Sequence, residues 1–343
     1  MRDTRIPVRL RSTQDVILAV PHILGFHPSN SLVLLDIASQ HGITAVRVDL
    51  PAARHRRQVA EDVVNSLPNL TAAMLVVFDD GPTDPAADPP PHAGLVDVVT
   101  TALRRRGTRD VLAVWAQSAH LGARWHSYTD PALGGTLPDH KYTELAAANA
   151  VVGHVTFASR EELAAQLAPV DDEILARRQI LLDQTTIGQG IPRDARAAVL
   201  LVFDTITASR KRGGPLDDDQ VVQVAQALSD PEVRDACFTF ALGRLADEAE
   251  RLWLELTRGC PASVRANPAT LLAFSACVRG NEALASIALD HALTADPGHR
   301  LGGLLRTALD TGMPNDQLVE IIKGLAITEA RLLFEAGTKG AFG

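Results

Sequence analysis

The sequence predicts an α/β domain followed by an all-α domain. Two observations support this prediction. In the first half of the chain, apolar strand patterns alternate with helical patterns. After Pro169 the strand signal vanishes, and helical patterns follow one another to about residue 336. We therefore expect an α/β domain over residues 1–169, an all-helical domain over residues 170–336, and a flexible tail over residues 337–343.

The strand patterns of the first half predict a mixed sheet with flanking helices. Residues 31–37 and 43–50 are separated by a short loop, which favours an antiparallel hairpin. Residues 73–78 and 111–116 are unbroken apolar runs, as expected of strands that are buried on both faces. Residues 123–128 are expected to pair back onto the strand at 111–116.

Helices in the first half are predicted at 16–20, 56–66 and 93–106. Ser12 and Asp15 form a capping-box pattern before the first helix, and Pro21 is expected to end it. Residues 81–91 contain five prolines among small and acidic residues, so we expect a mobile surface loop there.

Helical patterns in the second half predict a series of helices at 172–187, 193–212, 218–229, 231–243, 246–258, 268–279, 281–295, 299–311 and 315–335. Asn267 followed by Pro268 is typical of a helix start. One stretch follows the spacing of a tetratricopeptide repeat, and residues 36 positions upstream echo it. The positions concerned are Ala276, Ala285, Leu289 and Pro297, echoed by Phe240, Ala249, Trp253 and Pro261. Two interpretations remain open: a tetratricopeptide-like hairpin that binds a protein, and a hairpin that only packs within its own domain.

Composition restricts the class of protein. Hydrophobic residues make up 46 % of the chain and charged residues 22 %, which is typical of a folded globular protein. No signal-peptide pattern and no long apolar run is found, so we expect a cytoplasmic protein with no membrane partner. The three cysteines are isolated and contain no CxxC pair, which predicts neither a disulfide framework nor a zinc site. No cofactor is expected.

Three basic runs, at 54–57, 104–106 and 210–212, lie near the ends of predicted helices. We interpret them as solvated cations that complement helix dipoles. No aromatic residues are interleaved with them, and the net charge of the chain is −8. These observations argue against nucleic acid as a partner.

Several segments resemble one known family. They are Leu10–Ser12, the block Ala19–Pro28 that contains GFHP, Ser31–Val33, Arg47–Pro51, Ser159–Leu163 and the repeat-like Gly280–Pro297. Together they resemble the actinobacterial domain of unknown function 4192 family, over nearly the whole chain. The resemblance implies an actinobacterial or actinophage origin and implies no activity. Within the GFHP block, His22 replaces a tyrosine that is more usual at that position.

Complete catalytic signatures are missing from the sequence: GxxxxGK[ST], GxSxG and HExxH do not occur. The first weaker candidate is His27, which could bind a metal or carry a proton. The alternative is that Gly25–Pro28 forms a rigid turn with Phe26 in the core. The second candidate is Asp79 with Asp80, directly after an apolar strand, joined by Asp49 at the end of another. Carboxylates at strand ends can bind Mg²⁺ or transfer protons, although aspartates there also simply form turns.

The third candidate is the aromatic segment at the end of the first half. On a strand, His126 and Tyr128 share one face, while Trp125 and Ser127 share the other. An imidazole beside an aromatic ring could bind a planar ligand. The alternative is that these side chains fill one face of the sheet.

Three hypotheses of function follow from these patterns. The leading one is a non-catalytic protein-interaction or regulatory module that binds a protein partner through its helical half. The second is a small-molecule enzyme, such as a metal-dependent hydrolase, with its site at the strand ends. The third is a structural subunit of a homo-oligomer.

Overall fold

The computed structural model describes residues 12–38, 44–67, 70–81, 90–138, 155–187, 194–209, 212–311, 313 and 315–334. The chain divides into two compact units, Met1–Leu163 and Ala164–Gly343. The boundary predicted after residue 169 lies six residues further along the chain (169 − 163 = 6). Most of the predicted loop at 81–91 and the whole predicted tail at 337–343 lie outside the described residues.

The first unit is built on a six-stranded sheet with the order β2-β1-β3-β4-β5-β6. All neighbouring strands are antiparallel except β3 and β4, which are parallel. The predicted hairpin and the predicted return of the fifth strand are confirmed, and β6 was not predicted. The strands are β1 (Ser31–Asp36), β2 (Thr44–Asp49), β3 (Ala72–Phe78), β4 (Asp110–Ala116), β5 (Arg124–Ser127) and β6 (Gly134–Thr136).

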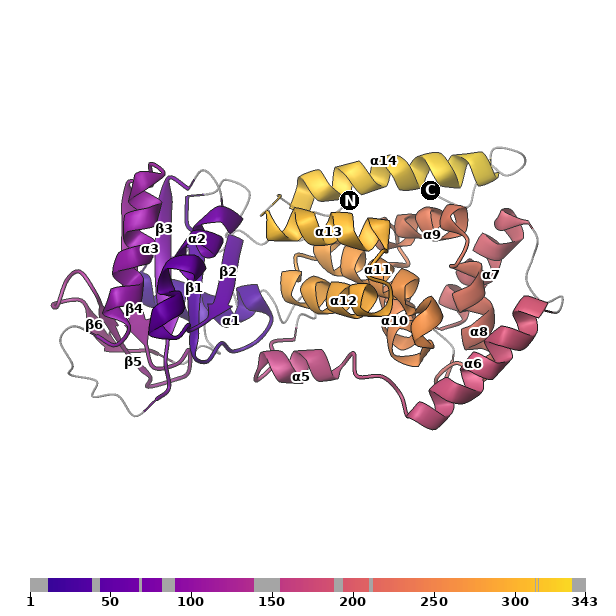
Figure 1. The fold of residues 1–343 in the computed structure, drawn as a ribbon, viewed down its shortest axis with the longest axis horizontal. Helices are drawn as coiled ribbons and strands as arrows, with labels where there is room; N and C mark the ends of the chain where they lie inside the picture. Colours follow the sequence, from indigo (N-terminus) through magenta and orange to yellow (C-terminus); the bar gives the residue numbers. More distant parts are fainter. Residues whose placement is uncertain are drawn as a thin grey trace. The chain divides into compact units, whose positions relative to one another are not determined.

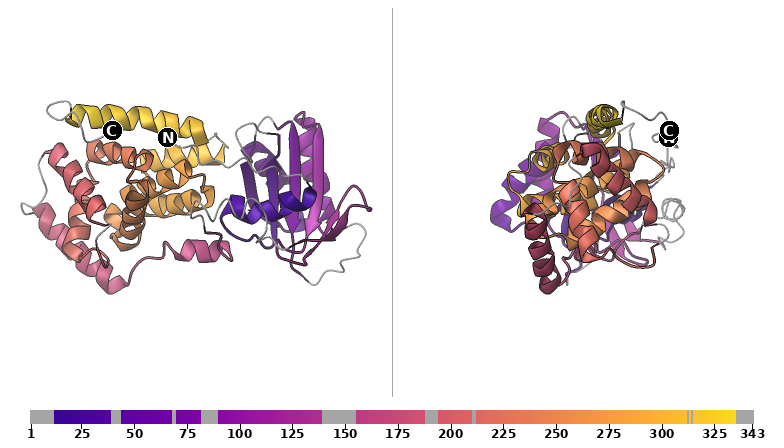
Figure 2. Two further views of the ribbon diagram at one scale, coloured as in Figure 1. Left: turned by 180° about the vertical axis from the view of Figure 1, so that it is seen from behind. Right: turned by 90° about the vertical axis from the view of Figure 1, so that its right-hand side faces the viewer.

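Helices cover both faces of this sheet. Helices α2 (Arg56–Ser66) and α3 (Ala93–Arg105) lie on one face (Figure 1), and α1 (Thr13–Leu24) lies on the other, as the reverse view shows (Figure 2). A short 3₁₀ helix, η1 (Ala53–His55), leads into α2. Alternating residues of β1, β3 and β4 pack with α2 and α3 in one core that includes Leu32, Leu34, Leu75, Val77, Leu95 and Val99. The mixed sheet with flanking helices is therefore confirmed.

Helix α1 corrects one boundary. Its capping box is present, since Ser12 Oγ accepts from Asp15 N–H and the Asp15 carboxylate accepts from Ser12 N–H. The helix nevertheless continues through Pro21 and ends at Gly25, whose φ of 77° lies in the left-handed region. The prediction that Pro21 ends the helix is wrong. Burial of apolar side chains on both sides of Pro21 offsets the one backbone hydrogen bond that proline cannot donate.

The second unit is helical. Its helices are α6 (Asp172–Ile187), α7 (Ala195–Ala208), α8 (Asp218–Ala227), α9 (Pro231–Cys237), η3 (Phe238–Leu242), α10 (Ala246–Gly259), α11 (Ala262–Val278), α12 (Glu282–Ala295), α13 (Arg300–Asp310) and α14 (Asn315–Phe334). A short helix, α5 (Arg160–Ala165), contains the division between the units. None of the helices in the described ranges is long and apolar enough to cross a membrane.

Helices α11 and α12 form a tightly packed hairpin. The turn between them contains Gly280, with a φ of 75°, and Asn281, whose side chain accepts from Leu284 N–H at the start of α12. Helix α11 begins at Ala262, so the start predicted at Pro268 is wrong. Pro268 lies inside the helix, in a segment whose following residues are almost wholly buried, and this packing overrides the local signal. The tetratricopeptide likeness itself stays a prediction.

Candidate functional site

The carboxyl end of β3 positions the first polar group. Val77 belongs to the core under α2 and α3, so Asp79, two residues later, points to the same side of the sheet. The backbone of Asp79 is held because its N–H donates to the Ala116 carbonyl at 3.2 Å. Its Oδ1 accepts from Gly81 N–H at 3.0 Å. The side chain is thereby fixed at the strand end, facing the start of α3.

His92 is the partner of Asp79. Its Nε2 lies 2.9 Å from Asp79 Oδ2, and both side chains are largely shielded from solvent. His92 is the residue before α3, and its φ of 62° is unusual for a residue other than glycine. A backbone in this region costs on the order of 1 kcal/mol, which the hydrogen bond to Asp79 offsets. A neutral His92 that donates Nε2–H to Asp79 keeps Nδ1 as an acceptor.

Tyr128 fixes the segment before His92. The phenolic hydroxyl donates to the Pro91 carbonyl. Burial raises the pKa of the Tyr128 hydroxyl far above its usual value, and the negative charge of Asp79 adds to the rise. Tyr128 therefore stays protonated at neutral pH and acts as a hydrogen-bond donor. Asp79, His92 and Tyr128 together form the strand-end cluster discussed below.

His126 lies on the same face of the sheet as Tyr128. Its ring stacks near Trp115, with centroids 6.2 Å apart and an interplanar angle of 20°. Gly134 on β6 is its cross-strand neighbour, and a Cβ there would lie 2.7 Å from His126 Nδ1, so a larger residue would displace the His126 ring. Trp125 faces the opposite side of the sheet and is buried. The predicted division of this segment between two faces is confirmed, and no common ligand-binding surface for all three side chains results.

The other predicted carboxylates do not join Asp79. Asp49 lies on the opposite face of the sheet, where its Oδ1 is 2.6 Å from Arg47 Nη2. Asp80 is exposed and, being next in sequence to Asp79, points to the other side. The three carboxylates suggested as a joint metal-binding set, Asp49, Asp79 and Asp80, therefore do not converge in this arrangement. Across the described segments, no group of three or more His, Cys, Asp or Glu side chains is placed to hold a metal.

His27 belongs to a separate place on the α1 side. Its N–H donates to the Phe157 carbonyl at 2.9 Å, and the neighbouring Phe26 is buried, as the turn interpretation predicts. The ring of His27 stacks on that of His120, with centroids 4.4 Å apart and an interplanar angle of 17°. Parallel stacked rings do not direct their nitrogens toward one point, so this pair does not itself resemble a metal site.

Two of the three basic runs can be compared with the helix ends, because residues 210 and 211 of the third lie outside the described residues. Arg104 and Arg105 lie in the last turn of α3, where they complement the helix dipole as expected. Arg56 and Arg57 instead begin α2, at the positive end of its dipole, so the dipole interpretation is wrong there. The guanidinium of Arg56 lies over Gly94, where Nη1 would be 3.0 Å from an added Cβ. Arg56 thus reaches the first turn of α3, next to the strand-end cluster.

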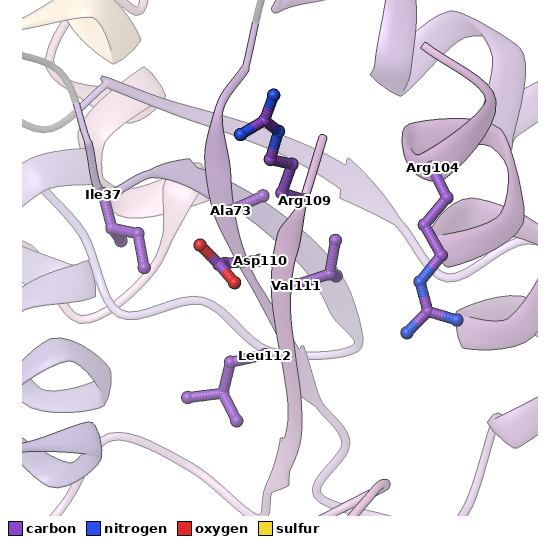
Figure 3. Close-up of a pocket in the computed structure, with 7 residues that line it drawn as sticks. All are labelled: Ile37, Ala73, Arg104, Arg109, Asp110, Val111 and Leu112. Carbon is purple, nitrogen blue, oxygen red and sulfur yellow. The ribbon is translucent and has the colours of Figure 1, made fainter. Parts of the chain in front are cut away.

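A shallow pocket of about 320 Å³ lies at the other end of β3 and β4 (Figure 3). Its lining residues are Ile37, Ala73, Arg104, Arg109, Asp110, Val111 and Leu112. The strand-end cluster and the other predicted site residues are not among them. Arg104 and Arg109 lie apart from each other, and Asp110 lies close to Arg109 and on the side away from Arg104 (Figure 3). We therefore assign the candidate site to the strand-end cluster and not to this pocket.

Sequence reasoning missed His92, His120 and Trp115. For His92 a signal was available, because it lies in the connection between an apolar strand and a helix, and such connections line the ligand-binding edge of α/β sheets. No comparable signal exists for His120 or Trp115, since their contacts depend on which distant segments pack together.

Comparison with known proteins gives one match. The model of the family described as "Domain of unknown function (DUF4192)" matches residues 14–316. No curated protein and no solved structure matches the chain.

Proposed function

The chain belongs to the DUF4192 family, and we propose that it is a non-catalytic protein-interaction module whose helical unit binds a protein partner. The support comes from the second unit. Helices α10, α11, α12 and α13 pack successively on one another along the chain. On the last of these four helices, α13, Leu304 is 67 % accessible to solvent.

An exposed leucine on this helix is a suitable centre for a protein contact. Apolar side chains that are exposed singly are common on protein surfaces, but a binding site needs an apolar anchor within a polar rim. On the helix, the neighbours of Leu304 four residues before and three residues after are Arg300 and Thr307, and both are exposed. Leu304 is thus an apolar residue between polar, solvent-exposed neighbours. We propose that this interaction takes place in the cytoplasm of an actinobacterium.

The interaction proposal is tested by capturing partners from an actinobacterial extract on three forms of the chain, namely the parent, Leu304→Arg and Leu121→Arg. We expect Leu304→Arg to reduce capture of a specific partner about tenfold or more, because a buried anchor contributes well over 1 kcal/mol to binding. The matched control is Leu121→Arg, since Leu121 is 64 % exposed but belongs to the first unit. Circular dichroism checks that all baits are folded. Identical proteins on all three baits would contradict the proposal.

The strand-end cluster favours a second candidate function, a small-molecule enzyme such as a hydrolase. An imidazole oriented by a carboxylate, as His92 is by Asp79 at 2.9 Å, is the arrangement of a general base. It lies where α/β sheets bind ligands, at the carboxyl end of a strand and the start of a helix. Tyr128 supplies a protonated hydroxyl beside it.

A melting experiment distinguishes the metal-dependent form of this second candidate. We expect the same melting curve with EDTA, with Mg²⁺ and with Mn²⁺. The reason is that the Asp79 carboxylate is already occupied by His92 and Gly81 N–H, while Asp49 lies on the other face. A bound ion would stabilise the folded chain by mass action. A rise with Mn²⁺ that is lost in Asp79→Asn or Asp80→Asn would rank the metal-dependent enzyme first.

A further inference from the structure

Strand β2 lies at one edge of the sheet and, among the described strands, pairs only with β1. Leu50 N–H, just after the strand, donates to the Asn30 carbonyl at 2.9 Å. Hydrogen bonds alternate along an antiparallel ladder, so the odd-numbered residues, including Arg47 and Asp49, direct their N–H and C=O groups away from β1. A row of such groups is able to pair with a further strand.

The outward row also carries two opposite charges. Arg47 Nε donates to Ser31 Oγ at 2.8 Å, which holds the arginine against the sheet. The Asp49 side chain is 82 % exposed, although one of its oxygens is 2.6 Å from Arg47. Arg47, 18 % exposed and held over β1, and Asp49, which is open to solvent, thus place opposite charges two residues apart on one face of the edge strand.

We infer that β2 pairs antiparallel with β2 of a second copy of this chain, with Val48 opposite Val48. In this register Arg47 of each copy lies opposite Asp49 of the other, so four charges of alternating sign form a closed network. Shifting the pairing so that Arg47 lies opposite itself would place like charges together, which is destabilising. The charge pattern thus selects the second copy as occupant and also selects one register. This contact concerns the first unit and is independent of the partner proposed for the helical unit.

Sedimentation equilibrium on the full chain tests the pairing. We expect the parent to show a monomer–dimer equilibrium and Arg47→Glu or Asp49→Arg alone to weaken it about tenfold, since attractive pairs become repulsive. Mixing these two variants creates opposite charges at both contacts, so a heterodimer should form with about the parent affinity. A strictly monomeric parent, or a mixture that associates no better than each variant alone, would overturn the inference.

Cysteine cross-linking tests the register without changing either charge. Val48→Cys places two thiols opposite each other, within reach of a disulfide, because Cβ atoms of directly opposed residues are about 5 Å apart. In the matched control, Val46→Cys, each thiol lies opposite Leu50 of the other copy. The three native cysteines are buried and do not compete. Mild oxidation should link the Val48→Cys chain alone. Linking of neither variant, or of both equally, would overturn the register.

Discussion

Leu289→Asp should unfold the helical unit at a much lower temperature than the parent. Leu289 lies on α12, is fully buried, and is held in the tightly packed hairpin with α11. An unpaired carboxylate at such a site costs several kcal/mol or forces its own protonation. For a unit of this size, that loss lowers the melting temperature by about 10 °C or more. Ala285→Glu, on the same buried face, should act in the same direction.

The matched control is Thr294→Asp, because Thr294 is exposed on the same helix. It should leave the melting temperature nearly unchanged. Calorimetry or circular dichroism measures the transition. If Leu289→Asp or Ala285→Glu melts within about 1 °C of the parent, these positions are not buried in solution, and the packing described for α12 is wrong.

Arg178→Met should destabilise the helical unit by about 2–4 kcal/mol. Arg178 is buried, and its Nε donates to Asp218 at 2.7 Å, which links α6 to α8. Its Nη1 donates to the Gly259 carbonyl at 2.8 Å, which links α6 to the end of α10. Removing the guanidinium leaves that buried carbonyl without this donor, and methionine supplies only apolar volume.

Arg177→Met is the control for this substitution. Arg177 binds the same Asp218 carboxylate but its side chain is 57 % exposed, so solvent screens the pair and its loss should destabilise the unit much less than the loss of Arg178. Chemical denaturation of the two variants gives the comparison. Equal losses for Arg177→Met and Arg178→Met would show that burial of the guanidinium does not decide its contribution.

Two prolines show that tertiary packing can override a local helix-boundary signal in the sequence. Pro21 and Pro268 both carry strong helix-boundary signals, and both lie inside helices. A proline removes one backbone donor, a local and limited cost. The residues around each proline are buried almost completely, and that gain is summed over many side chains. Where burial and the lost hydrogen bond compete, burial contributes more free energy and the helix continues. A short window of sequence does not contain the residues against which the helix packs, so it cannot predict this outcome.

The residues of the candidate site also differ in whether the sequence alone could predict them. Asp79 could be predicted because it follows an apolar strand, and strand ends are where α/β sheets bind ligands. That Asp49 lies on the opposite face, and that His92 is the actual partner, depends on strand pairing and on how the connection from β3 returns to α3. These are long-range contacts, which periodicity does not report.

The sequence by itself determined the two-part architecture, the β1–β2 hairpin, the buried strands β3 and β4, and the alternation of His126 and Tyr128 against Trp125. Each of these follows from the period of side chains along one segment or from a short connection. Only the tertiary structure decided that β1 lies between β2 and β3, that Asp79 binds His92, and that His27 stacks on His120. The physical reason is that a segment's period reveals which of its faces is buried, whereas the choice of partner depends on packing free energy summed over segments distant in the chain.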